Sequence, residues 1–250
     1  MTKKYKIYIS EKMKKALISD AEIFGFAKKD GSVNLNGFIK ELLVNYYDEY
    51  CTNISKRREL ILNDFTDLRS LSKKDAGIIA DRIIGKYIQS NMLKGGRSTA
   101  LTITVSAGSL DVIKSIENNF LSEISLSQYI NNLMAAYFTI PQKDREIIIF
   151  RETFEELRRA IKSKKVITFS SAKAASIIFR IRPYIIAVSK NDGCNYLLCS
   201  DDGPGIPRSF KISQIHALYT TKKFFKPSEE MLREFKESSA YLVDTHSEMV

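Results

Sequence analysis

Alternating apolar and polar residues predict two β-strands that lie far apart in the chain. In each segment three apolar residues are separated by polar ones, the period of two that puts alternate side chains on opposite faces of a strand. The two sets share a constant offset of 96 positions and consist of Tyr5, Ile7 and Ile9 and of Leu101, Ile103 and Val105. We therefore expect one half-buried strand near the start of the chain and a second near residue 103.

Two helical patterns follow each strand. Apolar residues recur every three or four positions in 13–24 and again in 110–120, as in amphipathic helices. The second helices match more closely: at an offset of 91, Leu35, Phe38, Ile39, Leu42, Leu43 and Tyr46 align with Leu126, Tyr129, Ile130, Leu133, Met134 and Tyr137. Polar residues in 34–36 and 125–127 stand where an N-cap and a first helical turn belong. The chain therefore contains a degenerate strand–helix–helix repeat.

This repeat, residues 1–50 and 99–143, resembles the ribbon-helix-helix family. Members of that family pair two such units through an antiparallel two-stranded ribbon, which reads the major groove of DNA. Because both copies lie in one chain, the resemblance implies an intramolecular pseudo-dimer whose outward face carries Lys4, Lys6 and Tyr8. The second copy offers threonine and serine on that face. Two alternatives therefore stay open: the module contacts nucleic acid, or it is a scaffold or dimerisation unit.

Positive charge is the feature of the composition that bears most on function. Lysine and arginine outnumber aspartate and glutamate by 39 to 29, a formal net charge of +10. A positive surface favours an anionic partner such as nucleic acid. Residues 51–98 form a basic segment with helical patterning, which we interpret as a linker between the repeat copies. Its cations either lie on a solvated helix face or contact phosphates.

Short strands dominate the last third of the chain. A helix is expected over 144–162, and strong turn sequences stand at 191–193 and 201–205. The expected strands are 166–169, 177–188, 195–199, 208–212 and 216–220. Five short strands in succession predict a small β-barrel. We place this barrel with its leading helix at 144–226 and an acidic helical tail at 227–250, which makes the predicted fold class α+β.

Three segments of this region resemble the WYL domain family. Pro183-Tyr184 opens the central strand as in that family, and Asn195-Tyr196-Leu197 stands in the place of the Trp-Tyr-Leu triplet that names it. The third segment, residues 208–215, reads Arg-Ser-Phe-Lys-Ile-Ser-Gln-Ile and resembles the family's Arg-Thr-Phe-Arg-Leu-Asp-Arg-Ile pattern. It departs from that pattern where Lys211 and Gln214 replace the second and third arginines. The resemblance covers 146–226. It implies a small Sm-like barrel with a basic, aromatic groove for nucleic acid or nucleotides.

By this resemblance the groove would use Tyr184, Tyr196, Arg208, Lys211 and Arg182. Aromatic faces can stack bases, and cationic side chains can bind phosphates. The same tyrosines could instead fill the core of the barrel. Strand alternation puts Arg208 and Lys211 on opposite faces of a flat strand, so only a bulge or a barrel edge would bring both into one groove.

Catalytic and metal-binding patterns are missing from the sequence. It has no Walker loop, nucleophile elbow or histidine–carboxylate pattern, so we predict no enzyme, and we expect the paired acids Asp201 and Asp202 to face solvent. Three cysteines and two histidines offer no zinc spacing, so we expect no metal and no cofactor. Without a long apolar run or a secretion signal, the sequence predicts a cytoplasmic protein with no membrane partner.

Two hypotheses of function follow. The architecture resembles the WYL accessory proteins found beside type VI CRISPR effectors, which implies binding of single-stranded RNA, with DNA as the other candidate, and modulation of an effector protein. The alternative is a transcriptional regulator whose ribbon binds duplex DNA and whose barrel senses a nucleotide or oligonucleotide. A subunit that binds only protein, or that forms a homodimer, is also compatible with the sequence.

Overall fold

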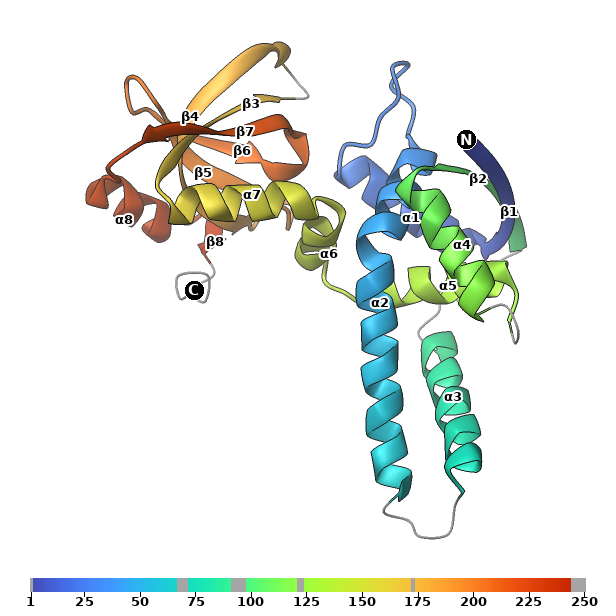
Figure 1. The fold of residues 1–250 in the computed structure, drawn as a ribbon. Coiled ribbons are helices and arrows are strands. Elements are labelled where there is room, and N and C mark those ends of the chain that lie inside the picture. The colour runs from blue at the N-terminus through green and yellow to red at the C-terminus, as the bar shows by residue number, and fades with distance from the viewer. Residues whose placement is uncertain (1, 67–71, 91–97, 121–123, 172–173, 244–250) are drawn as a thin grey trace. The chain divides into compact units, whose positions relative to one another are not determined.

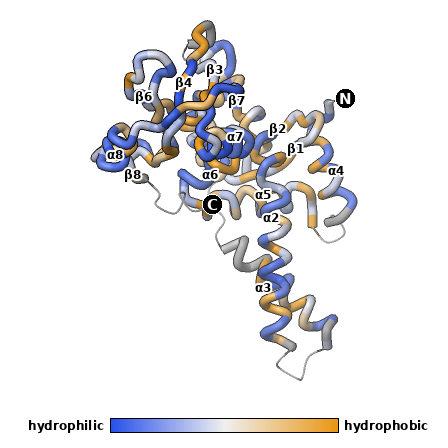
Figure 2. Tube along the Cα trace, turned by 60° about the vertical axis from the view of Figure 1, so that its left-hand side comes forward, coloured by the Kyte–Doolittle hydropathy of each residue, from blue (hydrophilic) through white to orange (hydrophobic). Residues whose placement is uncertain are grey.

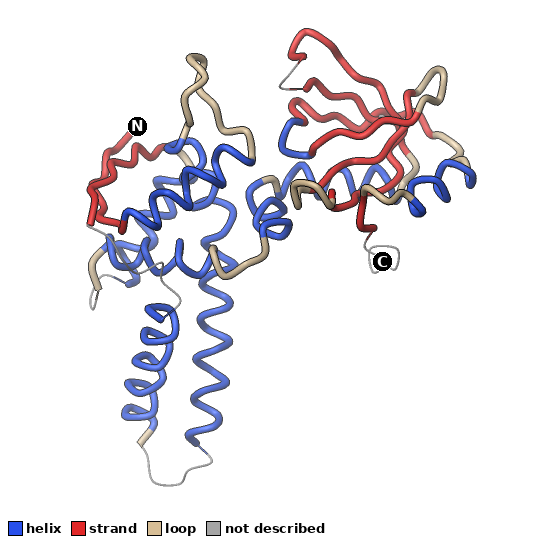
Figure 3. The backbone as a smooth tube through the Cα atoms, turned by 180° about the vertical axis from the view of Figure 1, so that it is seen from behind, coloured by secondary structure: helices blue, strands red, loops and turns tan. Residues whose placement is uncertain are grey.

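The computed structural model describes residues 2–66, 72–90, 98–120, 124–171 and 174–243. The chain folds into two compact units, residues 1–141 (unit 1) and 142–250 (unit 2). Unit 1 is mainly helical with one two-stranded ribbon, and unit 2 is built on an antiparallel sheet (Figures 1 and 3). The predicted α+β class is confirmed. Within the described ranges, no helix combines the length and the apolar character needed to cross a membrane.

Unit 1 contains the two strand–helix–helix segments that the sequence predicts, with a helical hairpin between them. In chain order its elements are β1 (Thr2–Ser10), α1 (Glu11–Ile23), α2 (Leu35–Thr66), α3 (Lys73–Ser90), β2 (Ser98–Ser106), α4 (Gly108–Phe120) and α5 (Leu126–Tyr137). The N-caps expected before the second helices are present: Asn34 Oδ1 accepts from the Gly37 amide, and the Ser125 hydroxyl accepts from the Gln128 amide. The Ser10 hydroxyl caps α1 in the same way, by accepting from the Met13 amide.

The two distant strands pair with each other as expected. β1 and β2 run antiparallel, and Lys6 lies opposite Thr102. Thr102 is also the counterpart of Lys6 at the offset of 96, so the pseudo-two-fold axis of the repeat passes through this pair. The apolar faces point inward, where Ile7 and Ile103 are fully buried. Each strand thereby covers apolar surface that it could not bury alone.

Each second helix holds the strand of the other copy. Asn36 at the start of α2 donates from Nδ2 to the carbonyl of Thr104 (3.1 Å) and accepts from its amide (2.7 Å). On the other side of the axis, the Tyr8 amide donates to the Ser127 hydroxyl (3.3 Å), and Asn131 Nδ2 donates to the Tyr8 carbonyl (2.6 Å). By the two offsets Tyr8 corresponds to Thr104 and Ser127 to Asn36. The copies are therefore interlocked rather than only adjacent.

The second helices supply most of the core of unit 1. Of the six matched pairs, five are buried in both copies, and Leu35 and Leu126 are half-buried. Tyr137 lies at the centre, with its ring 6.3 Å from that of Phe38 and 5.8 Å from that of Tyr46. The close match at one offset thus reflects two helices that share one core.

Helix α2 extends through residue 50, where we placed a domain boundary, and forms a hairpin with α3 (Figure 1). Ala76, Ala80 and Ile84 of α3 are buried, and Arg58 Nε of α2 lies 2.8 Å from an oxygen of Asp81. Apolar and polar residues alternate along the hairpin (Figure 2). The described part of the predicted basic linker is therefore the outer half of α2 together with α3, and 67–71 and 91–97 lie outside the described residues.

Unit 2 has all five strands that the sequence predicts, and one short strand more. Its elements are α6 (Gln142–Ile149), α7 (Arg151–Lys162), β3 (Lys165–Ser171), β4 (Ala174–Ser189), β5 (Asn195–Asp201), β6 (Pro207–Lys211), η1 (Ile212–Gln214), β7 (Ile215–Phe224), α8 (Glu229–Glu237) and β8 (Tyr241–Val243). The single expected helix is divided into α6 and α7 at Phe150. The strand order is β6-β5-β4-β3-β7, and β8 pairs with the end of β4.

The sheet expected to form a small barrel is not closed over the described residues. The sheet has two open edges, β6 and β7, and no ladder joins them. Between these strands the chain forms η1, where Ile212 is fully buried, and Ile215 follows with 4% of its surface exposed. Apolar side chains, and not backbone hydrogen bonds, therefore close the core at this point.

The two faces of the sheet are covered differently. On the inner face, Phe154 and Leu157 of α7 pack on Ile167, Phe169 and Ile181. On the outer face, α8 contributes Phe235 to a smaller cluster with Tyr184 and Leu198. Helix α8 lies within the acidic tail expected at 227–250, and it covers only one end of the outer face.

Replacing Asn36 tests the interlocked arrangement of unit 1. We expect Asn36→Ala to lower the free energy of unfolding by about 1–3 kcal/mol, because both backbone groups of Thr104 lose a partly buried partner. Amide hydrogen exchange at Thr104 should accelerate with it. Asn53→Ala, at an exposed position of the same helix, is the control and should change stability by less than about 0.5 kcal/mol. If the two substitutions had equal effects, the hydrogen bonds between Asn36 and Thr104 would not stabilise unit 1.

Candidate nucleic-acid interface

The ribbon of unit 1 presents the residues that the repeat singles out. Lys4, Lys6 and Tyr8 lie on its exposed face, and 52% of the Tyr8 surface is accessible. The Lys6 ammonium lies 5.5 Å from the centre of the Tyr8 ring. On β2 the paired positions hold Thr104 opposite Lys4 and Thr102 opposite Lys6. The ribbon is therefore basic on one strand and neutral on the facing positions of the other.

Tyr184 belongs to the core of unit 2. Only 7% of its surface is exposed, and its ring lies 5.5 Å from that of Phe225 and 5.7 Å from that of Phe235. Its hydroxyl accepts a hydrogen bond from the amide of Ser228, the N-cap of α8. This packing leaves no open ring face on which a base could stack.

Tyr196 and Lys211 lie side by side and share a carboxylate. They are directly paired between β5 and β6, and both contact Asp192 Oδ2, at 3.1 Å from the Tyr196 hydroxyl and 3.4 Å from Lys211 Nζ. Burial, together with the charge of Asp192, raises the pKa of Tyr196 to about 12, so its hydroxyl stays protonated. Only 14% of the Lys211 side chain is exposed. This pair stabilises the turn before β5 and offers little free charge.

A buried carboxylate, that of Glu146, also holds the turn before β5 in place. Glu146 of α6 is fully buried, and its Oε2 accepts from the amide (2.6 Å) and the side chain (2.9 Å) of Asn195. Burial raises the pKa of Glu146 against the opposing effect of these hydrogen bonds. Asn195 is thus an internal anchor of β5.

Arg208 lies on the other face of β6 from Lys211. It pairs with Cys199, and its Nε lies 2.7 and 2.8 Å from the two oxygens of Asp201. The flat-strand argument therefore holds: the structure does not bring Arg208 and Lys211 into one groove. About 45% of the Arg208 side chain is exposed, with a carboxylate beside it.

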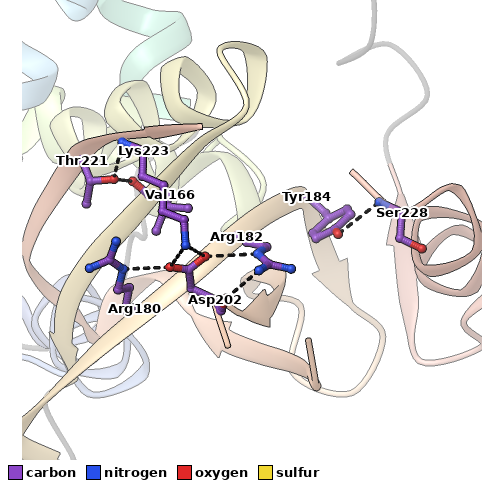
Figure 4. A network of polar contacts seen from close by, with 8 residues as sticks. All are labelled: Val166, Arg180, Arg182, Tyr184, Asp202, Thr221, Lys223 and Ser228. Atoms are coloured by element: carbon purple, nitrogen blue, oxygen red, sulfur yellow. Dashed lines mark hydrogen bonds and ion pairs between the residues drawn. The ribbon is translucent and has the colours of Figure 1, made fainter. Parts of the chain in front are cut away.

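Arg182 belongs to a cluster of cations that sequence reasoning identified only in part. Arg180, Arg182 and Lys223 all bind Asp202 (Figure 4). Arg180 Nε lies 2.8 Å from Oδ2 of Asp202, and Arg182 Nε lies 3.2 Å from Oδ1. Lys223 Nζ lies 2.9 and 2.8 Å from the two oxygens. We call these four residues the cation cluster.

The cation cluster carries an excess of positive charge on an accessible surface. Three cations surround one carboxylate, and 54% of the Arg180 side chain and 49% of the Lys223 side chain are exposed. Only 8% of the Asp202 side chain is exposed. Its burial alone would raise its pKa, but hydrogen bonds from Lys223, Arg182 and Arg180 outweigh burial and lower it. The expectation that Asp202 faces solvent is wrong, because the turn after β5 places it beneath these cations.

The sequence could have indicated two members of the cation cluster, Arg180 and Arg182. Arg180 and Arg182 are two apart on a strand and therefore share a face. The amide of Asp202 donates to the carbonyl of Arg180 (3.0 Å), which places the carboxylate beside both. Lys223 comes from β7, across β3, and no local pattern points to it. Among the described residues, no group of three or more histidine, cysteine or acidic side chains could hold a metal ion.

Replacing Asp202 tests the electrostatics of the cluster. We expect Asp202→Asn to lower the free energy of unfolding by about 1–3 kcal/mol at neutral pH, because three cations lose the negative charge that they share. A carboxyl with a lowered pKa stabilises the fold above its unfolded pKa of about 3.9, and this contribution is lost as the pH falls through the folded value. The difference between wild type and variant should therefore be constant above about pH 5 and shrink below about pH 4.

Urea unfolding across this pH range measures the difference. Glu155→Gln, at an exposed position of α7, is the matched control and should show little change at neutral pH. If Asp202→Asn were as stable as wild type at neutral pH, the cations would not depend on this carboxylate.

Comparison with known proteins places the fold. No family model matches the chain, and no curated protein matches it significantly. A solved structure described as "Crystal structure of a CRISPR Cas-related protein" aligns with a TM-score of 0.58 over 97% of this chain and 68% of that chain, at 19% sequence identity. At that identity the likeness concerns the fold, and it extends over both units of this chain.

Proposed function

We propose that this chain is a non-enzymatic accessory protein that binds single-stranded nucleic acid, with RNA favoured over DNA, and modulates a CRISPR effector. The observation that carries the proposal is the cation cluster, where three cations share one carboxylate on an exposed surface. Positive charge beyond what the protein itself neutralises is the main source of affinity for a sugar–phosphate chain.

The cluster has donors left for a phosphate. Arg180 contacts Asp202 through Nε, and a guanidinium carries five N–H donors in all. The N–H groups of its two outer nitrogens can therefore donate to a phosphate oxygen. Lys223 adds a second half-exposed cation. Asp202 orders both side chains beforehand, which lowers the conformational entropy lost on binding.

Two further features support the proposal. The interlocked strand–helix–helix copies fit the ribbon-helix-helix resemblance, and a leading helix with an antiparallel sheet in the order β6-β5-β4-β3-β7 fits the WYL resemblance. The likeness of the whole chain to a CRISPR Cas-related protein supports the CRISPR association. The interface we propose differs from the groove expected at the outset, because it centres on Arg180 and Lys223 in place of Tyr184 and Lys211.

Removing the two exposed cations tests the proposal. We expect Arg180→Ala/Lys223→Ala to weaken binding of single-stranded RNA by about tenfold or more at low salt, as two charged contacts to phosphate are lost. The log–log salt slope should fall in magnitude by about 1.4, at about 0.7 for each phosphate contact on a single strand. Arg182, which also pairs with Asp202, is unchanged in this variant, so we expect the fold to be preserved. Fluorescence anisotropy over a salt series measures both quantities.

The control variant removes the same charge elsewhere. Arg158→Ala/Lys162→Ala alters two exposed cations of α7, which covers the inner face of the sheet. Its affinity and salt slope should stay close to those of wild type. Equal losses in the two double variants would show that net charge alone, and not the cation cluster, determines binding.

The ribbon supports a second candidate function, a regulator that binds duplex DNA. Its exposed Lys4, Lys6 and Tyr8 could contact a duplex, although β2 offers threonines at the facing positions. If this function holds, Lys4→Ala/Lys6→Ala/Tyr8→Ala should abolish binding of duplex DNA while sparing single strands. If duplex binding persists unchanged in the triple variant, the ribbon is a scaffold in this protein.

A further inference from the structure

An exposed tyrosine lies on the same face of the sheet as the cation cluster. Tyr219 of β7 is 67% exposed and pairs directly with Thr168 of β3. Thr168 pairs on its other side with Arg180 of β4. Directly paired residues of antiparallel strands point to the same face, so Arg180, Thr168 and Tyr219 form one row across the outer face. Two strand spacings, about 10 Å, separate the backbones of Arg180 and Tyr219.

A bulge in β7 shapes this row. His216 pairs with Ser170, and Tyr219 pairs with Thr168, so β7 uses three steps where β3 uses two. In a regular strand residues three apart face opposite sides, whereas His216 and Tyr219 both face outward here. Ala217 lies within the bulge at a φ of 47°, a left-handed conformation that is unfavourable for alanine. Such strain persists where the surrounding structure maintains it, and it often marks a functional surface.

We propose that Tyr219 is a base-stacking site for the single strand whose phosphates bind the cation cluster, an inference that rests on the proposed function. The sugar–phosphate backbone of the nucleic acid lies at Arg180 and Lys223, and one of its bases lies flat on the Tyr219 ring. Ile178, 75% exposed and on the same face as Arg180, adds an apolar contact beside this path. The occupant is single-stranded nucleic acid because only an unpaired base can present its ring to an isolated aromatic side chain.

The charge and the ring act together at this site. The cation cluster is net positive and thus attracts the phosphate backbone, while stacking on an aromatic ring is available to every base. We therefore expect binding with little base preference. Tyr219 is distinct from the tyrosines expected to form a groove, since Tyr184 is buried and Tyr196 is held by Asp192.

The test separates contacts to bases from contacts to phosphates. The probes are an oligodeoxythymidylate of about 12 nucleotides and an abasic oligomer of the same length and charge, measured with the full chain. Tyr219→Ala should weaken binding of the oligodeoxythymidylate by about tenfold and leave binding of the abasic oligomer unchanged. Tyr219→Phe, which keeps the ring, should retain wild-type affinity for both. Arg180→Ala should weaken both to a similar extent.

Phe224 provides a matched control on the same strand. It is 66% exposed and pairs with Lys165, on the inner side of the sheet, so Phe224→Ala should alter neither affinity. The inference is overturned if Tyr219→Ala leaves the oligodeoxythymidylate unaffected or weakens both probes equally. If wild-type protein binds neither probe, nor an oligouridylate of the same length, at low salt, the proposed function itself fails, which is a different outcome from the loss of stacking alone.

Discussion

In unit 2 a single carboxylate, that of Asp202, lies between three cationic side chains and holds them within one small area of the sheet. Like charges about 6 Å apart near a protein surface repel by roughly 3 kcal/mol, which one shared acceptor offsets. The side chain of Asp202 is 8% exposed, whereas those of Arg180 and Lys223 are about half exposed. The anion is thus internal and the cations face outward. This arrangement gives the outer face an ordered positive charge, on which the proposed binding of nucleic acid depends.

The two units solve the problem of burying apolar strands in different ways. In unit 1 the strands cover each other's helices, and polar clamps at Asn36 and Asn131 fix the register. In unit 2 the sheet stays open, with α7 on the inner face and α8 on one end of the outer face. The uncovered part of that outer face carries Arg180 and Tyr219. A fold that leaves one sheet surface half covered therefore has a surface available for a partner.

Much of the local structure was predictable because it depends on neighbours in the sequence. The periods of two and 3.6 gave the strands and helices of both units, and the offsets of 96 and 91 gave the pairing of the copies. The site was less predictable. Tyr184 and Lys211 lie in segments that resemble a family motif, yet Tyr184 packs against α8 and Lys211 binds Asp192. Arg182 was identified, but Lys223 was missed, since its contact with Asp202 joins residues 21 positions apart across a neighbouring strand.

The sequence by itself determined which segments are strands and helices, which of their faces are apolar, and that the chain has a basic character suited to an anionic partner. Only the tertiary structure decided that the sheet stays open, which tyrosines are buried and where positive charge remains unneutralised. The physical reason is that side-chain periodicity is local, whereas burial and charge pairing depend on residues from different strands. Asp202 looks like a solvent-facing acid in the sequence and becomes the buried centre of a cluster when β4, β5 and β7 come together.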